Sequence, residues 1–73
     1  MVDYGKIGKF LQDVRKRKGI SLYRLAKISG IPETTVRSYE QGRMPGIANT
    51  AIILNAMGIK LELVDVTDKG DAG

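Results

Sequence analysis

Apolar residues recur at helical spacing along most of this sequence, and glycines separate the segments in which they do so. Near the start, Ile7, Leu11 and Val14 stand at positions i, i+4 and i+7, with Phe10 beside them. This spacing places one apolar face along a helix. Four basic residues follow, and then Gly19 stands where a helix commonly ends in the left-handed conformation. The pattern predicts a first amphipathic helix that ends just before Gly19.

Three more helices are predicted downstream. Ser21 is a good N-cap for a short second helix that ends at Gly30. A third helix is expected over residues 32–41, because a proline is well tolerated in the first turn. A fourth helix is expected over residues 47–57, stopped by Gly58. The residues expected to face inward on the second helix are Leu22, Leu25, Ala26 and Ile28.

The period changes after the fourth helix. Residues 60–66 begin with alternating polar and apolar positions and are rich in valine and leucine, which predicts a short strand. No other segment reads as a partner strand, so this one either frays or pairs with a second copy of itself. The small, polar residues 67–73 are expected to form a flexible tail.

Length and composition narrow the classes of function. Seventy-three residues suffice for one small domain. The absence of Cys and His removes the disulfide, the thiolate metal site and the usual general base. No Gly-x-x-x-x-Gly-Lys phosphate loop and no convincing pair of carboxylates is present. We therefore expect no enzyme, no metal, no cofactor and no small-molecule ligand.

The sequence also bears on location. Its longest apolar run, residues 51–54, is far shorter than the roughly 20 residues that cross a bilayer. Its start lacks the basic and apolar regions of a secretory signal. We expect a cytoplasmic protein with no membrane partner.

Charge is divided unevenly along the chain. The net charge is +4, but residues 1–43 carry ten Lys and Arg against four acids, whereas residues 44–73 carry two bases against four acids. A front half with a balance of +6 suggests a surface that faces a polyanion. The alternative to a polyanion-binding surface is a solvated surface whose uneven charge has no binding role. The second and third helices, joined by a glycine turn, form a helix-turn-helix candidate, with a plain helical bundle as its alternative.

Several short segments carry a resemblance to a known family. The residues in question are Ile7-Gly8-Lys9, Val14 to Ser21, Leu25-Ala26 with Gly30-Ile31, Thr35 to Gly42, and Pro45 with Ala56 to Ile59. In this order and spacing the chain resembles the Cro/cI-type (XRE) helix-turn-helix repressors over residues 7–59, without a gap. The resemblance implies an all-α, lambda-repressor-like domain of four to five helices over residues 1–59. It also implies binding to operator DNA, commonly as a dimer.

The resemblance assigns roles to individual side chains. The N-terminal part of the third helix would read base edges in the major groove. The expected base readers are Glu33, Thr34, Thr35, Arg37 and Ser38. The expected phosphate contacts are Lys9, Lys16, Arg17, Lys18, Tyr23, Arg24, Lys27 and Arg43. Glu33 and Arg37, one turn apart, have an alternative in simply pairing with each other. Arg15 and Glu40 look like the family's structural ion pair.

Three positions depart from the family pattern. Leu22 stands where a phosphate-binding glutamine is common, and Pro32 replaces the usual side-chain cap of the third helix. The fourth helix carries more apolar residues than one core face needs, which is typical of an interface. The expected dimer interface combines this helix with the predicted strand, through Ile52, Leu54, Leu61, Leu63, Val64 and Val66.

The function expected from these observations is a homodimeric repressor that binds a palindromic operator in double-stranded DNA. One alternative is the antitoxin of a toxin-antitoxin pair, which would bind a toxin protein as well as DNA. Another is an interaction module that keeps the fold but binds DNA weakly.

Overall fold

Four helices account for the secondary structure of residues 5–61, the part of the chain that the computed structural model describes. They are α1 (Gly5–Arg17), α2 (Leu22–Ser29), α3 (Glu33–Glu40) and α4 (Ile47–Ala56). The all-α class is therefore confirmed for this part of the chain. The helix bounds lie within a residue or two of those expected from the sequence.

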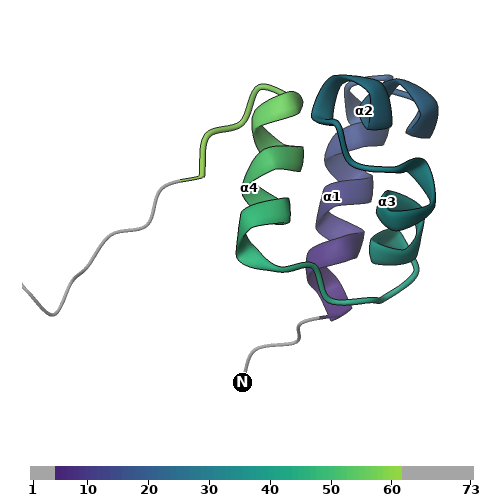
Figure 1. Cartoon of the computed structure of the whole chain (residues 1–73), viewed down its shortest axis with the longest axis vertical. Helices are drawn as coiled ribbons and strands as arrows, with labels where there is room; N and C mark the ends of the chain where they lie inside the picture. Colours follow the sequence, from purple (N-terminus) through teal and green to yellow (C-terminus); the bar gives the residue numbers. More distant parts are fainter. Residues whose placement is uncertain (1–4, 62–73) are drawn as a thin grey trace, which may run out of the picture.

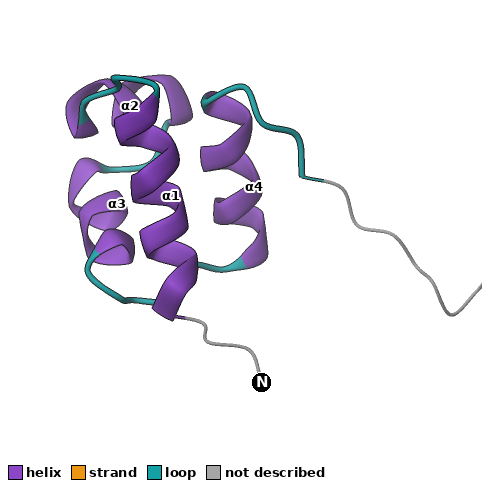
Figure 2. Cartoon of the chain, turned by 180° about the vertical axis from the view of Figure 1, so that it is seen from behind, coloured by secondary structure: helices purple, strands orange, loops and turns teal. Residues whose placement is uncertain are grey.

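The helices form a small bundle around one core. α1 runs between α3 and α4 in Figures 1 and 2, and α2 lies across one end. The helix α3 packs against both α1 and α2, and α2 also packs against α4. The buried core consists of Leu11, Val14, Leu25, Ile31, Val36, Tyr39, Ile53, Leu54 and Met57.

Glycine follows each of the four helices, at a position where the backbone adopts positive φ. Gly19, Gly30, Gly42 and Gly58 all have positive φ, a backbone region that residues with a Cβ rarely adopt. At Gly30 the backbone N–H donates to the carbonyl of Ala26, which closes the last turn of α2. These glycines keep the helices short enough to fold back on one another.

Two residues occupy surroundings that differ from the sequence-based expectation. Ile28 was expected to face inward but is 46% exposed, and Phe10, expected beside the apolar face of the first helix, is 49% exposed. Each lies at the edge of an apolar stripe that no neighbouring helix in residues 5–61 covers. Leu54 was expected at the surface of a dimer interface, but it is 4% exposed and belongs to the core. Its assignment to the interface was wrong, because α4 buries two adjacent residues, Ile53 and Leu54, against the other helices.

The predicted strand is described only at its first two residues. Lys60 and Leu61 follow α4 without regular secondary structure. The remainder of the predicted strand, residues 62–66, and the predicted tail, residues 67–73, lie outside the described residues. No helix in residues 5–61 has both the length and the apolar character needed to cross a bilayer.

Candidate nucleic-acid interface

The turn between α2 and α3 fixes how the third helix is presented. Ser21 caps α2, its hydroxyl oxygen accepting a hydrogen bond from the N–H of Arg24 at 3.0 Å. At the other end the Ser29 hydroxyl accepts from the N–H of Ile31, and the Ile31 side chain enters the core. Pro32 begins α3 without a side-chain cap. The loss of that cap, expected from the sequence, leaves the helix intact.

One face of α3 is anchored and the opposite face is open to solvent. Val36 is fully buried and Tyr39 is 4% exposed, so the two residues hold the helix against the core. Thr34 and Arg37 are exposed. Among the other expected base readers, Glu33, Thr35 and Ser38 are half-buried. The Ser38 hydroxyl donates to the carbonyl of Thr35 at 2.8 Å, so its proton is used within the helix.

Glu33 and Arg37 form an ion pair on the surface of α3. The Nη2 atom of Arg37 lies 2.5 Å from Oε2 of Glu33, one helical turn away. The side chain of Arg37 is 47% exposed and that of Glu33 is 36% exposed. An exposed pair of this kind adds little stability, about 0.3–0.5 kcal/mol. It does restrict where the two side chains point.

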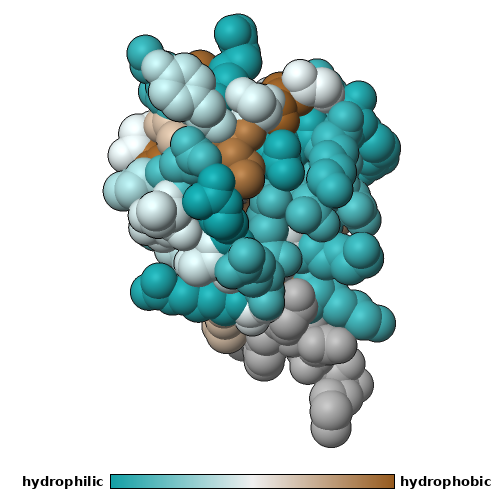
Figure 3. Space-filling model, turned by 90° about the vertical axis from the view of Figure 1, so that its right-hand side faces the viewer, coloured by the Kyte–Doolittle hydropathy of each residue, from teal (hydrophilic) through white to brown (hydrophobic). Residues whose placement is uncertain are grey.

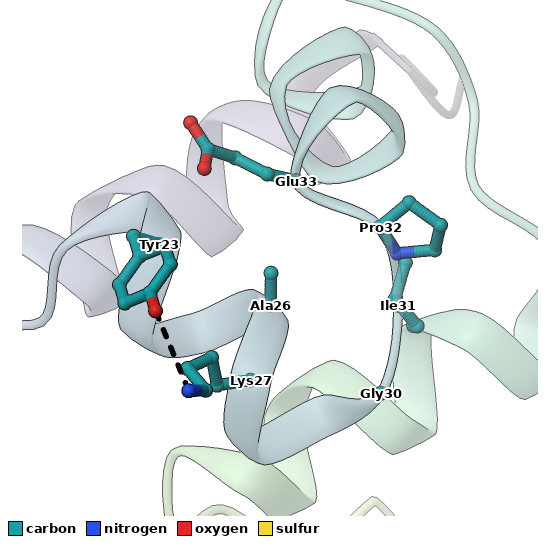
Figure 4. Close-up of a pocket in the computed structure, with 7 residues that line it drawn as sticks. All are labelled: Tyr23, Ala26, Lys27, Gly30, Ile31, Pro32 and Glu33. Atoms are coloured by element: carbon teal, nitrogen blue, oxygen red, sulfur yellow. Dashed lines mark hydrogen bonds between the residues drawn. The ribbon is translucent and has the colours of Figure 1, made fainter.

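A hollow of about 370 Å³ lies between α2 and the start of α3. Figure 4 shows Ala26 on α2 with its methyl group directed toward the space between Tyr23 and Glu33. Lys27 donates to the Tyr23 hydroxyl at 3.4 Å, and its ammonium lies 5.3 Å from the centre of the Tyr23 ring. The small side chain at position 26 thus leaves room between the two helices, with a cation and a carboxylate at the rim.

Exposed cations dominate the charge of residues 5–61. The two glutamates in this range, Glu33 and Glu40, each pair with an arginine, which leaves Asp13 as the remaining acid. All the cations expected to bind phosphate are exposed, as is Tyr23. Figure 3 shows hydrophilic residues over most of the side formed by α2 and α3, with hydrophobic residues in its upper part.

These cations do not all gather at one place. Tyr23, Arg24 and Lys27 lie together on α2, next to the start of α3. Lys9 instead lines a separate hollow of α1 with Lys6, Phe10 and Asp13.

Arg43 is held beside the end of α3. Its backbone N–H donates to the carbonyl of Ser38 at 3.0 Å, and its guanidinium carbon lies 5.7 Å from the centre of the Tyr39 ring. The Tyr39 hydroxyl in turn accepts from the side-chain amide of Asn49 on α4 at 2.8 Å. The buried Tyr39 therefore contacts both Asn49 of α4 and the exposed guanidinium of Arg43. Asn49 could not be identified from the sequence, because no spacing rule connects it to residue 39.

The expected ion pair between Arg15 and Glu40 is present and joins α1 to α3. The Nε and Nη2 atoms of Arg15 donate to the two carboxylate oxygens of Glu40 at 2.7 and 3.0 Å. Arg15 also donates through Nη1 to the carbonyl of Ile20, just before α2. Gln12 adds a fourth hydrogen bond, to Glu40 at 3.2 Å. With side chains 11% and 4% exposed, the pair fixes the helices that frame the site.

Gly8 is the other structural residue to which the sequence analysis gave no role. It is buried on α1, and a Cβ built on it would overlap the carbonyl oxygen of Tyr39 and lie 2.6 Å from the carbonyl carbon. The two helices thus touch backbone to backbone at this point. A glycine inside an apolar helical pattern was the signal that was available for it.

Comparison with known families bears directly on this arrangement. A family profile described as helix-turn-helix matches residues 11–64, well over half of the chain. The match contains all of α2, the turn, α3 and α4. None of the curated proteins matches the chain.

Proposed function

The chain belongs to the Cro/cI-type (XRE) family of helix-turn-helix DNA-binding transcription regulators, and from this premise we propose that it is a repressor. It acts as a homodimer on a palindromic operator. The observation that carries the proposal is the exposed face of α2 and α3, where polar and cationic side chains surround a helix anchored by Val36 and Tyr39. A regulator of this size represses by occupying the operator and excluding polymerase.

The proposed contacts divide into two kinds. Phosphate contacts set the register of a protein on DNA, and base contacts set the preferred sequence. Arg37 donates to guanine in the major groove, and Thr34 contacts a thymine methyl group or a phosphate. Tyr23, Arg24 and Lys27 on α2, together with Arg43, bind the phosphates on either side. The remaining proposed phosphate contacts are Lys9, Lys16, Arg17 and Lys18.

Salt dependence of DNA binding tests this division. Affinity for a site selected from random DNA should fall steeply as salt rises, with a slope of about 0.9 per phosphate contact. Arg43→Ala should weaken binding to selected and random duplexes by a similar factor and reduce the salt slope by about 1. Fluorescence anisotropy at several salt concentrations measures both quantities. An interaction module without DNA contacts would show weak binding and little slope.

Exposed apolar residues on α4 and after it support the homodimer. Ile52 is 42% exposed and Leu61 is 37% exposed, although α4 already contributes Ile53 and Leu54 to the core. The proposed interface joins Ile52 and Leu61 to the sequence-predicted strand that contains Leu63, Val64 and Val66. Two recognition helices related by a two-fold axis would then contact half-sites about 34–36 Å apart.

Ile52→Asp should dissociate the proposed dimer. A carboxylate buried in an apolar interface without a partner is costly, so the dimer dissociation constant should rise by at least about tenfold. Analytical ultracentrifugation over a range of concentrations measures it. Ile28→Asp is the matched control, because Ile28 has similar exposure, 46%, but lies on α2. A wild-type chain that stays monomeric at micromolar concentration would contradict the homodimer and the half-site spacing together.

The antitoxin alternative shares the proposed DNA contacts and adds a toxin protein as partner. Expression with the neighbouring gene separates the two versions. Under this alternative the neighbouring product is toxic by itself and co-purifies with the chain, whereas a repressor without a toxin partner yields neither result.

A further inference from the structure

We infer that Glu33 is a positioning residue, which holds the Arg37 guanidinium for contact with a guanine, and that it does not read a base of its own. This inference rests on the proposed DNA-binding function and assigns the roles within its recognition surface. It starts from the ion pair between Arg37 Nη2 and Glu33 Oε2, in which both side chains remain partly open to solvent.

The pair leaves Arg37 able to bind guanine. A guanidinium carries five N–H groups, and the contact with Glu33 involves the Nη2 end. Four N–H groups remain, one on Nη2, two on Nη1 and one on Nε, which is enough for a two-donor contact to the O6 and N7 atoms of guanine. Glu33 can therefore stay in place while Arg37 reads the base.

Holding Arg37 before binding lowers the entropic cost of the contact. A long, exposed arginine loses rotamer freedom when it becomes fixed on a base, and part of that loss is already incurred in the free protein if the side chain is paired. The start of α3 favours this arrangement, because Glu33 lies in the first turn and Arg37 in the last turn of the same helix.

The carboxylate is also better placed as a partner than as a reader. To accept a hydrogen bond from cytosine N4, Glu33 would have to leave Arg37 and approach DNA phosphates as a bare negative charge. Paired with Arg37, its charge is compensated. Glu33 also lines the hollow between α2 and α3, with its side chain extending on the side where Tyr23 lies (Figure 4), and it is half-buried whereas Thr34 is exposed.

The two roles predict different base preferences. Sequences are selected from a random duplex pool by the wild type, Arg37→Ala, Glu33→Ala, Glu33→Gln and the double variant Glu33→Ala/Arg37→Ala. Binding is then measured on the selected duplex and on one in which the guanine that Arg37 reads is replaced by adenine. We expect Arg37→Ala to lower the discrimination between these duplexes by about tenfold or more, and Glu33→Ala to lower it at the same base pair by about threefold to fivefold.

Further comparisons separate positioning from independent reading. Glu33→Gln keeps an acceptor oxygen and should fall between the wild type and Glu33→Ala. The double variant should discriminate no worse than Arg37→Ala. Asn55→Ala serves as the control, since this residue is exposed on α4 and has no proposed role in DNA binding. Thermal melting should be close to wild type for every variant, because the side chains concerned are at least partly exposed.

Two results would overturn the inference. One is a loss of preference in Glu33→Ala at a base pair other than the one affected by Arg37→Ala. The other is a double variant whose loss equals the product of the two single losses. If the wild type selects no sequence at all, the proposed function fails and this inference with it. If the wild type selects a sequence to which Arg37→Ala is indifferent, the inference alone fails.

Discussion

Gly8→Ala is expected to destabilise the domain by about 2 kcal/mol or more. The added Cβ would overlap the Tyr39 carbonyl, which belongs to the backbone of α3 and cannot rotate away as a side chain can. Overpacking of a core usually costs about 1–3 kcal/mol and sometimes more. The better helix propensity of alanine returns about 1 kcal/mol at most. The two helices must therefore move apart, and they carry Arg15 and Glu40 with them.

Urea denaturation followed by circular dichroism measures this loss. Gly46→Ala is the matched control, because a Cβ at Gly46 meets no atom within 4 Å and its φ of −70° suits any residue. Since Gly46 is the N-cap of α4, the control should lose less than about 1 kcal/mol. A Gly8→Ala variant as stable as Gly46→Ala would show that α1 and α3 are not in backbone contact.

Arg15→Ala is expected to cost about 3–5 kcal/mol, because it leaves the Glu40 carboxylate buried without its ionic partner. The Glu40 side chain is 4% exposed, so water cannot replace the two hydrogen bonds that Arg15 donates to it. The Ile20 carbonyl loses a donor as well. A domain of this length is stable by roughly 4–11 kcal/mol, so the substitution should remove between about a quarter and all of that stability.

Thermal and urea denaturation again provide the measurement. Arg37→Ala removes the same side chain from an exposed ion pair and should change stability by less than about 0.5 kcal/mol. The contrast between the two arginines depends on burial, since each forms an ion pair with a glutamate. If the two variants were equally stable, the buried pair would not be holding α1 to α3.

Local features of the sequence predicted the helices well. Ser21 offers a hydroxyl to the first turn of α2, and Gly30 supplies the positive φ at its end. Such signals act over three or four residues, so they need no knowledge of the rest of the fold. The helix-turn-helix family and its DNA-binding role were predicted through resemblance over residues 7–59 and are confirmed by the family match.

The errors fall at the edges of the apolar stripes. Helical spacing placed Ile28 among the inward residues of the second helix, yet it is about half exposed. Spacing likewise gave no reason to separate Ile52 from Leu54, of which the first is exposed and the second buried. Whether the edge of a stripe is covered depends on the angle and distance of the neighbouring helix, which a periodic pattern in one segment does not specify.

The sequence by itself determined the four helices, their ends, the family and the basic character of the front half. It also brought Arg15 and Glu40 to attention as an ion pair, through resemblance. Only the tertiary structure decided that Gly8 lies against the backbone of Tyr39, that Asn49 binds the Tyr39 hydroxyl, and that Glu33 pairs with Arg37 in the free protein. Helix formation depends on neighbours a few residues away, whereas the first two of these contacts join residues on different helices. The choice of partner for Glu33 depends on side-chain rotamers, and spacing permits several.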